Sequence, residues 1–226
     1  TQGPIPGALA EPVLYAPKPG PIVAKEPPPP IQETPPDQQP DGDNIQWIPG
    51  YWAWDDGRND FIWVSGVWRA IPPGQQWVPG YWSPAQGGFQ WVPGYWAPAD
   101  EQQQGIDYLP APPASLEQGP VGDPPNPDAT WAPGNWVWQD NQYAWRPGFW
   151  VNPQQGWMWN PASYNWTPNG YVYNQGFWDY PLANRGQPFA PVYFNQPVYR
   201  QPGFTYSPAV GLLTSGLLSS LFVRPS

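Results

Sequence analysis

The sequence Trp47-Ile48-Pro49-Gly50-Tyr51-Trp52 is the first of a series of hexapeptides of the form Trp-x-Pro-Gly-x-Trp. Further copies begin at Trp63, Trp77, Trp91, Trp131 and Trp145, and weakened copies begin at Trp159 and Tyr173. The first four copies start 16, 14 and 14 residues apart, and 14 residues also separate the later ones. Self-similarity at a fixed spacing is the signature of a repeat architecture, so this hexapeptide decides the fold.

Within each unit, the Pro-Gly dipeptide predicts a chain reversal. Proline fixes φ at about −65° and glycine tolerates positive φ, as the central positions of a type II turn require. We therefore expect turns at Pro49-Gly50, Pro79-Gly80, Pro93-Gly94, Pro133-Gly134 and Pro147-Gly148. Each turn would place the two tryptophans of its unit opposite one another as a buried cross-strand pair. The predicted pairs are Trp47 with Trp52, Trp63 with Trp68, Trp77 with Trp82, Trp91 with Trp96, Trp131 with Trp136, and Trp145 with Trp150.

A second reversal is predicted between consecutive units. Asp56-Gly57, Gly87-Gly88 and Asp140-Asn141 supply residues that adopt left-handed conformations, as hairpin turns require. Alternation then places Tyr143 and Trp145 on one face of a strand and the residue between them on the other. Each unit of about 14 residues should contain two short antiparallel strands. The expected fold class is all-β, a meander of short hairpins with one aromatic face.

The repeats fall into two arrays that other kinds of sequence flank and separate. A proline-rich arm at residues 1–44 precedes the first array at 45–98. A proline-rich acidic linker at 99–130 precedes the second array at 131–180. Residues 181–226 form a C-terminal segment that is prone to β-structure and ends in an apolar tail.

The arm is expected to be a docking element. Runs such as Pro27–Pro30 favour the extended polyproline conformation, which has no internal hydrogen bonds and becomes ordered by lying on a surface. We expect residues 1–44 to make few contacts with their own arrays and to lie along another subunit.

The C-terminal segment combines strand and helix signals. Short β-prone runs lie at 192–194, 198–199 and 204–206. Ser207 and Pro208 then resemble an N-cap and a first helical position, so a short helix is expected after them. Its leucines, within Ala209–Val223, would form an exposed strip of the kind that marks an interface.

Composition restricts the function classes. Among 226 residues there are 39 Pro, 24 Gly and 18 Trp but no Cys and no His, which excludes disulfides, thiol nucleophiles and imidazole bases. The chain has only 8 Lys and Arg against 17 Asp and Glu, so it has no basic stripe that could bind nucleic acid. Carboxylates such as Asp55-Asp56 and Asp100-Glu101 lie in predicted turns and linkers, where charges are usually solvated. We predict no catalytic residues, no cofactor, no metal site and no enzymatic activity.

The chain is expected to be exported. It begins at Thr1, which fits a mature product whose signal peptide has been removed. Its longest apolar stretch, Ala209–Val223, is too short and too rich in Ser, Thr and Gly to span a bilayer. The expected localisation is secreted, in the extracellular space or the cell envelope, with no transmembrane span.

The tandem hexapeptides, the aromatic residue two positions before several of them, and the proline-rich entry resemble the bacterial WXXGXW repeat proteins, also called YXWGxW or BcpO-related repeat proteins. The resemblance covers roughly residues 45–180. It implies a secreted or envelope-associated repeat protein and supplies no catalytic residues. Ser65 replaces proline in the second unit, and the units after Trp159 are degraded, so the second array is expected to end irregularly.

Two classes of function fit these features. The first is structural, with aromatic faces and exchanged arms of successive subunits packing into a fibre, coat or other cell-surface assembly. The second is polysaccharide or cell-wall binding, because flat aromatic rings with polar neighbours are common platforms for sugar rings. Tyr51, Tyr81 and Tyr95, in the predicted turns, are the candidate glycan-stacking residues. Whether the arm contacts its own chain separates the structural hypothesis from a self-contained β domain.

Overall fold

The computed structural model describes residues 6–10, 17–100 and 105–208, which consist mainly of short strands and extended segments. The strands are β1 (Ile22–Val23), β2 (Ile45–Ile48), β3 (Tyr51–Asp55), β4 (Asp60–Val64), β5 (Val67–Ala70), β6 (Gln75–Val78), β7 (Tyr81–Ala85), β8 (Gly88–Val92), β9 (Tyr95–Pro98), β10 (Thr130–Ala132), β11 (Asn135–Gln139), β12 (Gln142–Arg146), β13 (Phe149–Val151), β14 (Met158–Asn160), β15 (Ser163–Thr167), β16 (Gly170–Asn174) and β17 (Phe177–Asp179). Two 3-10 helices follow, η2 (Leu182–Asn184) and η3 (Val198–Arg200). The predicted all-β class, with antiparallel hairpins of short strands in two arrays, is confirmed.

Sixteen of these strands form four long hairpins, called A to D below. Hairpin A comprises β2–β5, hairpin B β6–β9, hairpin C β10–β13 and hairpin D β14–β17. In each hairpin the first strand pairs with the fourth and the second with the third, as β2 does with β5 and β3 with β4. One repeat unit is therefore one arm of a hairpin, and two consecutive units make the whole hairpin.

The Pro-Gly dipeptides do not reverse the chain. The predicted turns at Pro49-Gly50, Pro79-Gly80, Pro93-Gly94, Pro133-Gly134 and Pro147-Gly148 are wrong, because each dipeptide lies between two strands of the same hairpin arm. None of these five glycines has the positive φ that a type II turn requires. Proline has no N–H to donate, so the backbone hydrogen bonds between the two arms are interrupted at the dipeptide and resume after the glycine.

The reversals lie between units, at the second set of predicted turns. Asn59 has a φ of 51° in hairpin A, and Gly87 has a φ of 92° in hairpin B. In hairpin C, Asp140 and Asn141 have φ of 49° and 62°. Two successive left-handed residues fit the type I′ turn, whose twist matches that of the flanking strands. The three predicted turns are confirmed in position, but in hairpin A the left-handed residue is Asn59 and neither Asp56 nor Gly57.

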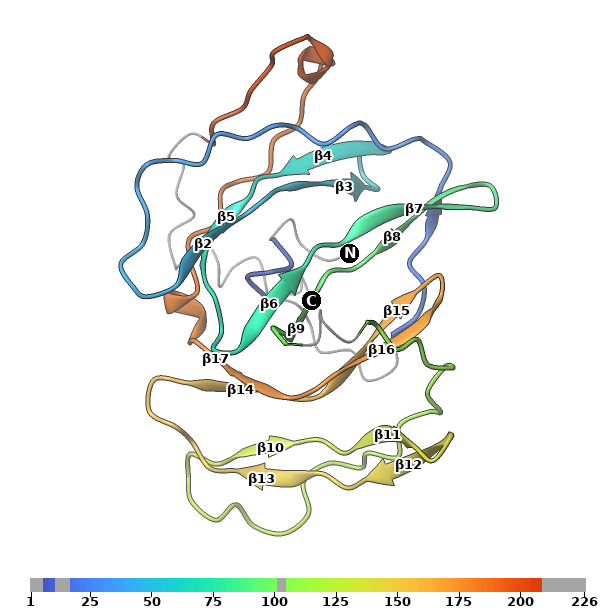
Figure 1. Cartoon of the computed structure of the whole chain (residues 1–226), viewed down its shortest axis with the longest axis vertical. Coiled ribbons are helices and arrows are strands. Elements are labelled where there is room, and N and C mark those ends of the chain that lie inside the picture. The colour runs from blue at the N-terminus through green and yellow to red at the C-terminus, as the bar shows by residue number, and fades with distance from the viewer. Residues whose placement is uncertain (1–5, 11–16, 101–104, 209–226) are drawn as a thin grey trace.

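The hairpins stack as layers in the order A, B, D, C (Figure 1). A side-chain hydrogen bond joins each pair of neighbours: Trp82 Nε1 to Trp52 O at 2.8 Å, Asn165 Nδ2 to Gly94 O at 3.2 Å, and Tyr164 Oη to Trp136 O at 2.7 Å. The outer layers A and C are thus the first hairpins of the two arrays, and the inner layers B and D are the second hairpins.

Two hydrophobic clusters of the core involve hairpin A. Between hairpins A and B, Ile48 and Val67 pack with Trp96. On the tryptophan face of hairpin A, Trp52 and Trp63 pack with apolar side chains of the arm and with aromatic rings from residues 194–206. Trp63 is only 1% exposed, so its removal would forfeit most of the burial energy of an indole.

The proline-rich arm lies on its own chain. β1 pairs with β8, and Ile31 is buried against the tryptophan face of hairpin A. The prediction that residues 1–44 make few contacts with their own arrays is therefore wrong for the described part of the arm. The indole N–H groups of hairpin A are donors that an extended segment with free carbonyl groups can satisfy.

Residues 181–206 return over hairpin A. Val192 pairs with Trp63, and Tyr206 pairs with Glu33, as isolated bridges in two of the β-prone runs. The prediction of β-structure at 198–199 is wrong, because Val198 begins the 3-10 helix η3 directly after Pro197. The helix expected after Ser207 and Pro208 lies outside the described residues.

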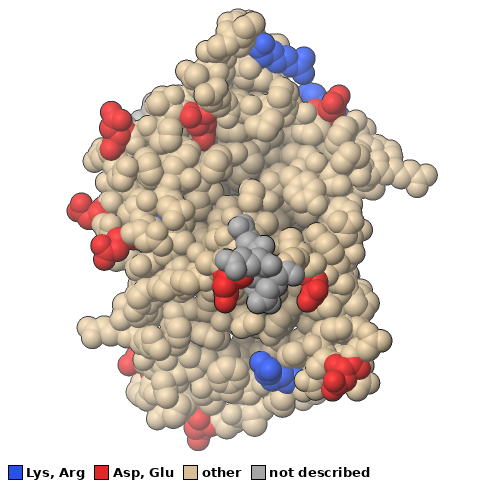
Figure 2. Space-filling view, in the orientation of Figure 1, with Lys and Arg blue, Asp and Glu red and all other residues tan. Residues whose placement is uncertain are grey.

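Among the described residues, no helix is long and apolar enough to cross a membrane. The face in Figure 2 carries acidic side chains scattered between uncharged ones, in keeping with a chain in which 11% of residues are charged.

Candidate functional site: glutamate straps on tryptophan hairpins

The tryptophans of the repeat pair between the two arms of a hairpin. The predicted pairs within units are wrong for Trp47 with Trp52, Trp63 with Trp68, Trp77 with Trp82, Trp91 with Trp96, Trp131 with Trp136, and Trp145 with Trp150, because the chain runs on through Pro-Gly. The observed partners are Trp47 with Trp68, Trp52 with Trp63, Trp77 with Trp96, Trp82 with Trp91, Trp131 with Trp150, Trp136 with Trp145, and Trp159 with Trp178. Their ring centroids lie 5.2 to 5.5 Å apart, mostly edge to face, and such a pair contributes about 0.5–1.5 kcal/mol beyond its buried area.

The glycine of each unit lies under an indole from the opposite arm. A Cβ atom on Gly66 would lie 2.5 Å from Trp47 Cζ2 and 2.5 Å from Ile48 O. A Cβ atom on Gly94 would lie 2.5 Å from Trp77 Cζ2. The motif thus requires glycine for the close approach of the two arms and not for a turn. The same relation holds for Gly50, Gly80, Gly134, Gly148 and Gly176.

A carboxylate from the arm binds at the centre of hairpin A. Residues 29–36, called strap 1 below, cross the tryptophan face of this hairpin. The Glu33 carboxylate accepts hydrogen bonds from Trp63 Nε1 at 2.8 Å, from Gly66 N at 2.9 Å and from Gly50 N at 3.1 Å. The glycines leave their N–H groups open to the carboxylate, and the hairpin supplies three donors to one side chain.

The linker places a second carboxylate on hairpin C, where the indole donor lies on the first arm of the hairpin and not on the second. Residues 114–121, called strap 2 below, bring Glu117 to Trp131 Nε1 at 3.1 Å and to the N–H of Gly134. The N–H of Gly119, within the strap, donates to Glu117 at 2.8 Å. Burial favours the neutral acid, but the three N–H donors outweigh it and hold the pKa of Glu117 below its ordinary value.

Both straps also receive indole N–H groups along their backbone. Trp52 Nε1 donates to Pro29 O and Trp68 Nε1 to Pro36 O, both at 2.9 Å, while Trp136 Nε1 donates to Ala114 O at 3.0 Å and Trp150 Nε1 to Val121 O at 3.2 Å. Each strap is therefore held at two carbonyl groups and at one central glutamate. The glutamate lies 14 residues before the first tryptophan of its array in both cases, Glu33 before Trp47 and Glu117 before Trp131.

The contacts between hairpins also correspond in the two arrays. In the first array Trp82 Nε1 donates to Trp52 O and Phe61 packs on Trp82 at 5.2 Å, and in the second Tyr164 Oη donates to Trp136 O and Tyr143 packs on Tyr164 at 6.1 Å. A strap, an outer hairpin and an inner hairpin thus form one structural unit that occurs twice. The first half contains strap 1 with hairpins A and B, and the second half contains strap 2 with hairpins C and D.

A buried ion pair joins the two halves. Arg69 Nη2 of hairpin A lies 2.6 Å from Asp179 Oδ2 of hairpin D, with the two side chains 0% and 1% exposed. Arg185 Nε lies 3.2 Å from the same oxygen, so two guanidinium groups share one carboxylate. Burial lowers the pKa of Arg69 to about 10, against the attraction of Asp179. Because removal of one partner leaves a buried charge uncompensated, this cluster fixes how the halves meet.

The candidate glycan-stacking tyrosines do not form one platform. Tyr81 is 48% exposed, as predicted. Tyr95 is only 8% exposed and packs near Val172 between hairpins B and D. Tyr51 stacks on Trp91 with ring centroids 4.9 Å apart. The expectation that all three face outward is wrong for Tyr95, because the inner hairpins pack back to back there.

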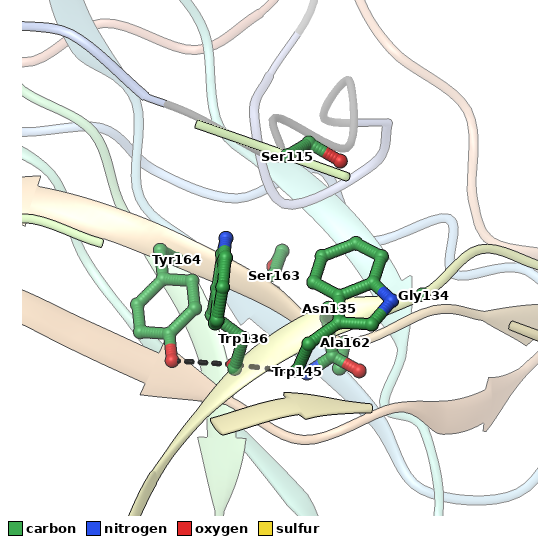
Figure 3. A pocket seen from close by; sticks show the side chains of 8 residues that line it. All are labelled: Ser115, Gly134, Asn135, Trp136, Trp145, Ala162, Ser163 and Tyr164. Carbon is green, nitrogen blue, oxygen red and sulfur yellow. Dashed lines mark hydrogen bonds between the residues drawn. The ribbon is translucent and has the colours of Figure 1, made fainter. Parts of the chain in front are cut away.

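One opening lies beside strap 2 and another beside the arm before strap 1. A cavity of about 10 Å³, lined by Ser115, Trp136 and Trp145 among others, lies between strap 2 and hairpins C and D and has room for one water molecule (Figure 3). A groove of about 300 Å³ lies between residues 21–25 and the tip of hairpin A at Trp54. The groove has the size of a small-molecule site, and the cavity does not. The described residues contain no group of three or more carboxylates placed to hold a metal ion.

Sequence reasoning missed the residues that carry most of the polar contacts. Glu33 and Glu117 stood in segments interpreted as a free arm and a solvated linker, although their equal distance from Trp47 and Trp131 was a detectable signal. Arg69 and Asp179 gave no comparable signal, because 110 residues separate them and no period relates them.

The family described as WXXGXW repeat (2 copies) matches residues 47–69, 73–97 and 130–151. These segments lie within hairpins A, B and C, so the two copies in one match correspond to the two arms of one hairpin. Hairpin D lies outside the matches, and there Ala162 replaces the first glycine of the motif. No curated protein and no solved structure matches the chain. The chain therefore carries repeats of the WXXGXW family in these three segments.

Proposed function

We propose that the chain is a non-enzymatic structural protein, exported to the cell surface or the extracellular space, where copies of it build an assembly. The arm lies on its own hairpin, which by itself fits a self-contained β domain, so the proposal rests on exchange between copies. The observation that carries it is that an extended strap closes the tryptophan face of each outer hairpin. A face completed by one extended segment is a surface that a neighbouring chain can complete equally well.

The contacts of the straps favour exchange between copies. Strap 1 is held at Pro29, Glu33 and Pro36 by indole and backbone N–H groups of hairpin A. A strap from a second copy would make the same bonds, and only residues 37–44 would need a new path between strap and hairpin. Domain swapping of this kind links chains at little cost in contact energy.

The known partners of the carboxylates favour a structural role over catalysis. Glu33 and Glu117 bind N–H donors of their hairpins, and Asp179 binds two guanidinium groups. A glycosidase would instead require two carboxyl groups that face each other across a substrate cleft, roughly 5–10 Å apart.

Electron microscopy and light scattering of the purified full-length chain test the proposal. We expect ordered or high-mass particles from the wild type, and a shift to smaller species when Glu33→Gln and Glu117→Gln are combined, because the straps then lose their charged anchors. Glu26→Gln, at an exposed arm residue, is the matched control. A wild-type chain that stays monomeric at all accessible concentrations would contradict the proposal.

Polysaccharide binding is the second candidate function, and the groove beside hairpin A favours it. Trp54 offers an indole, while Asp56, Asn59 and Lys25 offer polar groups along the same groove. This combination of one aromatic surface with a few polar groups is typical of ligand pockets. In a pull-down with insoluble cell-wall polysaccharide, Trp54→Ala should then reduce retention while Tyr81→Ala leaves it unchanged. Equal loss in both variants, or no retention of the wild type, would exclude the groove as the binding site.

A further inference from the structure

Hairpin C differs from the other three hairpins at the outer edge of its second arm, which is the edge that does not pair with the first arm. In hairpin A this edge pairs with Val192, in hairpin B it pairs with β1, and in hairpin D Tyr171 pairs with Leu109. In hairpin C, none of the described residues pairs with the outer edge of β12 or β13. Within the described part of the chain, one hairpin of the stack thus lacks an element that its three relatives have.

The cover of hairpin A shows what kind of element is missing. Residues 186–206 pair with Trp63 through two backbone hydrogen bonds, Trp63 N to Val192 O at 2.8 Å and Val192 N to Trp63 O at 2.9 Å. The same segment continues over strap 1, where Thr34 N donates to Tyr206 O at 2.8 Å and Tyr206 N donates to Gln32 O at 3.0 Å. An extended chain therefore adds to the hairpin and to the strap at the same time.

Aromatic side chains of this cover fill the space above the tryptophans. Tyr199 packs on Trp52 at 4.9 Å, Phe194 packs on Trp52 at 6.1 Å, and Phe189 packs on Trp47 at 6.4 Å. Beneath the cover, Trp52 and Trp63 are 4% and 1% exposed. The cover thus completes both the hydrogen bonding and the burial of hairpin A.

Residues 6–10, 17–100 and 105–208 leave the corresponding surface of the second half open. Trp136 and Trp145 occupy the places of Trp52 and Trp63 but are only partly buried. On strap 2, Leu116 and Val121 are 55% and 77% exposed, whereas Ile31 of strap 1 is buried. Among the described residues, no backbone group pairs with strap 2 as Tyr206 pairs with strap 1.

We propose that the outward face of hairpin C and strap 2 binds an extended, aromatic and proline-rich polypeptide segment of another chain, with the chemistry of residues 186–206. In the ladder of hairpin C, Trp136 and Trp145 face each other as Trp52 and Trp63 do in hairpin A, so the N–H and C=O of Trp145 point outward. An incoming segment would pair with these groups and lay its rings on Trp136 and Trp145. The surface would bind such a segment on a monomer, so the inference does not depend on the proposed assembly.

The open backbone groups favour a polypeptide as the occupant. The edge of β12 and strap 2 present donors and acceptors at strand spacing, which a partner strand satisfies in both places at once. The cavity below strap 2 in Figure 3 holds about one water molecule, so the ligand must lie on the surface rather than enter the molecule.

A synthetic peptide with the sequence of residues 186–206, added to the full-length chain, tests the proposal. We expect binding at one site, seen by isothermal titration calorimetry, together with slower hydrogen exchange at the N–H of Trp145. The N–H of Trp63 should not change, because Val192 already protects it. A peptide in which every Phe and Tyr is replaced by Ala is the ligand control and should not bind.

Variants of strap 2 identify the surface without a change to the tryptophans. Gln118→Pro removes the N–H that corresponds to that of Thr34, so it should weaken peptide binding by about tenfold, the effect of roughly one to two hydrogen bonds. Gln118→Ala retains the N–H and should bind as the wild type does. Absence of binding, binding without protection of Trp145, or equal affinity of both variants would overturn the proposal.

Peptide binding and assembly of copies can be tested separately. Peptide binding by a chain that remains monomeric would support this surface and contradict the proposed assembly. Assembly without peptide binding would support the structural function and overturn the proposed surface.

Discussion

A Cβ atom on Gly66 would lie 2.5 Å from Cζ2 of Trp47, the indole of the opposite arm of hairpin A. Because the backbone oxygen of Ile48, in the same opposite arm, would be equally close, Gly66→Ala must separate the arms and should destabilise the protein by about 1–3 kcal/mol. Gly20→Ala is the control, since a Cβ atom there would meet nothing within 4 Å. Urea unfolding followed by tryptophan fluorescence measures both variants, and equal stabilities would show that the arms tolerate a side chain.

The two halves should respond differently to loss of the same tryptophan. Trp63 is buried under residues 186–206, and Trp63→Ala should cost about 3–5 kcal/mol of the free energy of unfolding. Trp145 holds the same place in hairpin C but is only partly buried, so Trp145→Ala should cost distinctly less. Chemical unfolding of the two variants under one condition gives the comparison. A larger loss for Trp145→Ala would mean that hairpin C has a cover like that of hairpin A.

Strap 2 should weaken in acid. The pKa of Glu117 is lowered in the folded chain, so its contribution is fully present above the pKa of the unfolded chain, about 4.3. The contribution is lost as the pH falls through the lower folded pKa, where the carboxyl group binds a proton. Unfolding of the wild type and of Glu117→Gln between pH 7 and pH 3 should show a difference that shrinks toward acid. A difference independent of pH would contradict the assignment of the charged carboxylate to this site.

Loss of the carboxylate in the ion pair between the halves should destabilise the protein more than loss of one guanidinium group. Asp179→Asn leaves Arg69 and Arg185 buried without an anion and should cost about 3–5 kcal/mol. Arg185→Met leaves Arg69 and Asp179 paired at 2.6 Å and should cost less. Differential scanning calorimetry of the two variants compares them. If Arg185→Met were the more damaging change, Arg185 and not Arg69 would be the main partner of Asp179.

The sequence predicted the repeat, the all-β class and the turns between units, because these depend on local residue types. Asp140 and Asn141 form their turn because both residue types adopt the left-handed backbone conformation readily. The same reasoning failed at Pro49-Gly50. These two residues fit a type II turn, but they also fit an interruption of strand pairing within one arm of a hairpin. The choice between them depends on the arm opposite, since Gly50 faces Gly66 and Trp63 across the hairpin. Partners such as Glu33 and Arg69 could not be assigned for the same reason, because Glu33 meets Trp63 across 30 residues and Arg69 meets Asp179 across 110.

Separation along the chain also sets an order of folding events. Each strap reaches its hairpin over a short loop, whereas Arg69 and Asp179 meet across 110 residues. Loop closure costs more entropy as the loop lengthens, so straps and hairpins can close early and the docking of the halves comes late. The cover of hairpin A arrives later still, with Val192 and Tyr206. A chain that emerges from its amino end must therefore leave part of the aromatic face of its first half uncovered until residues 192–206 have appeared.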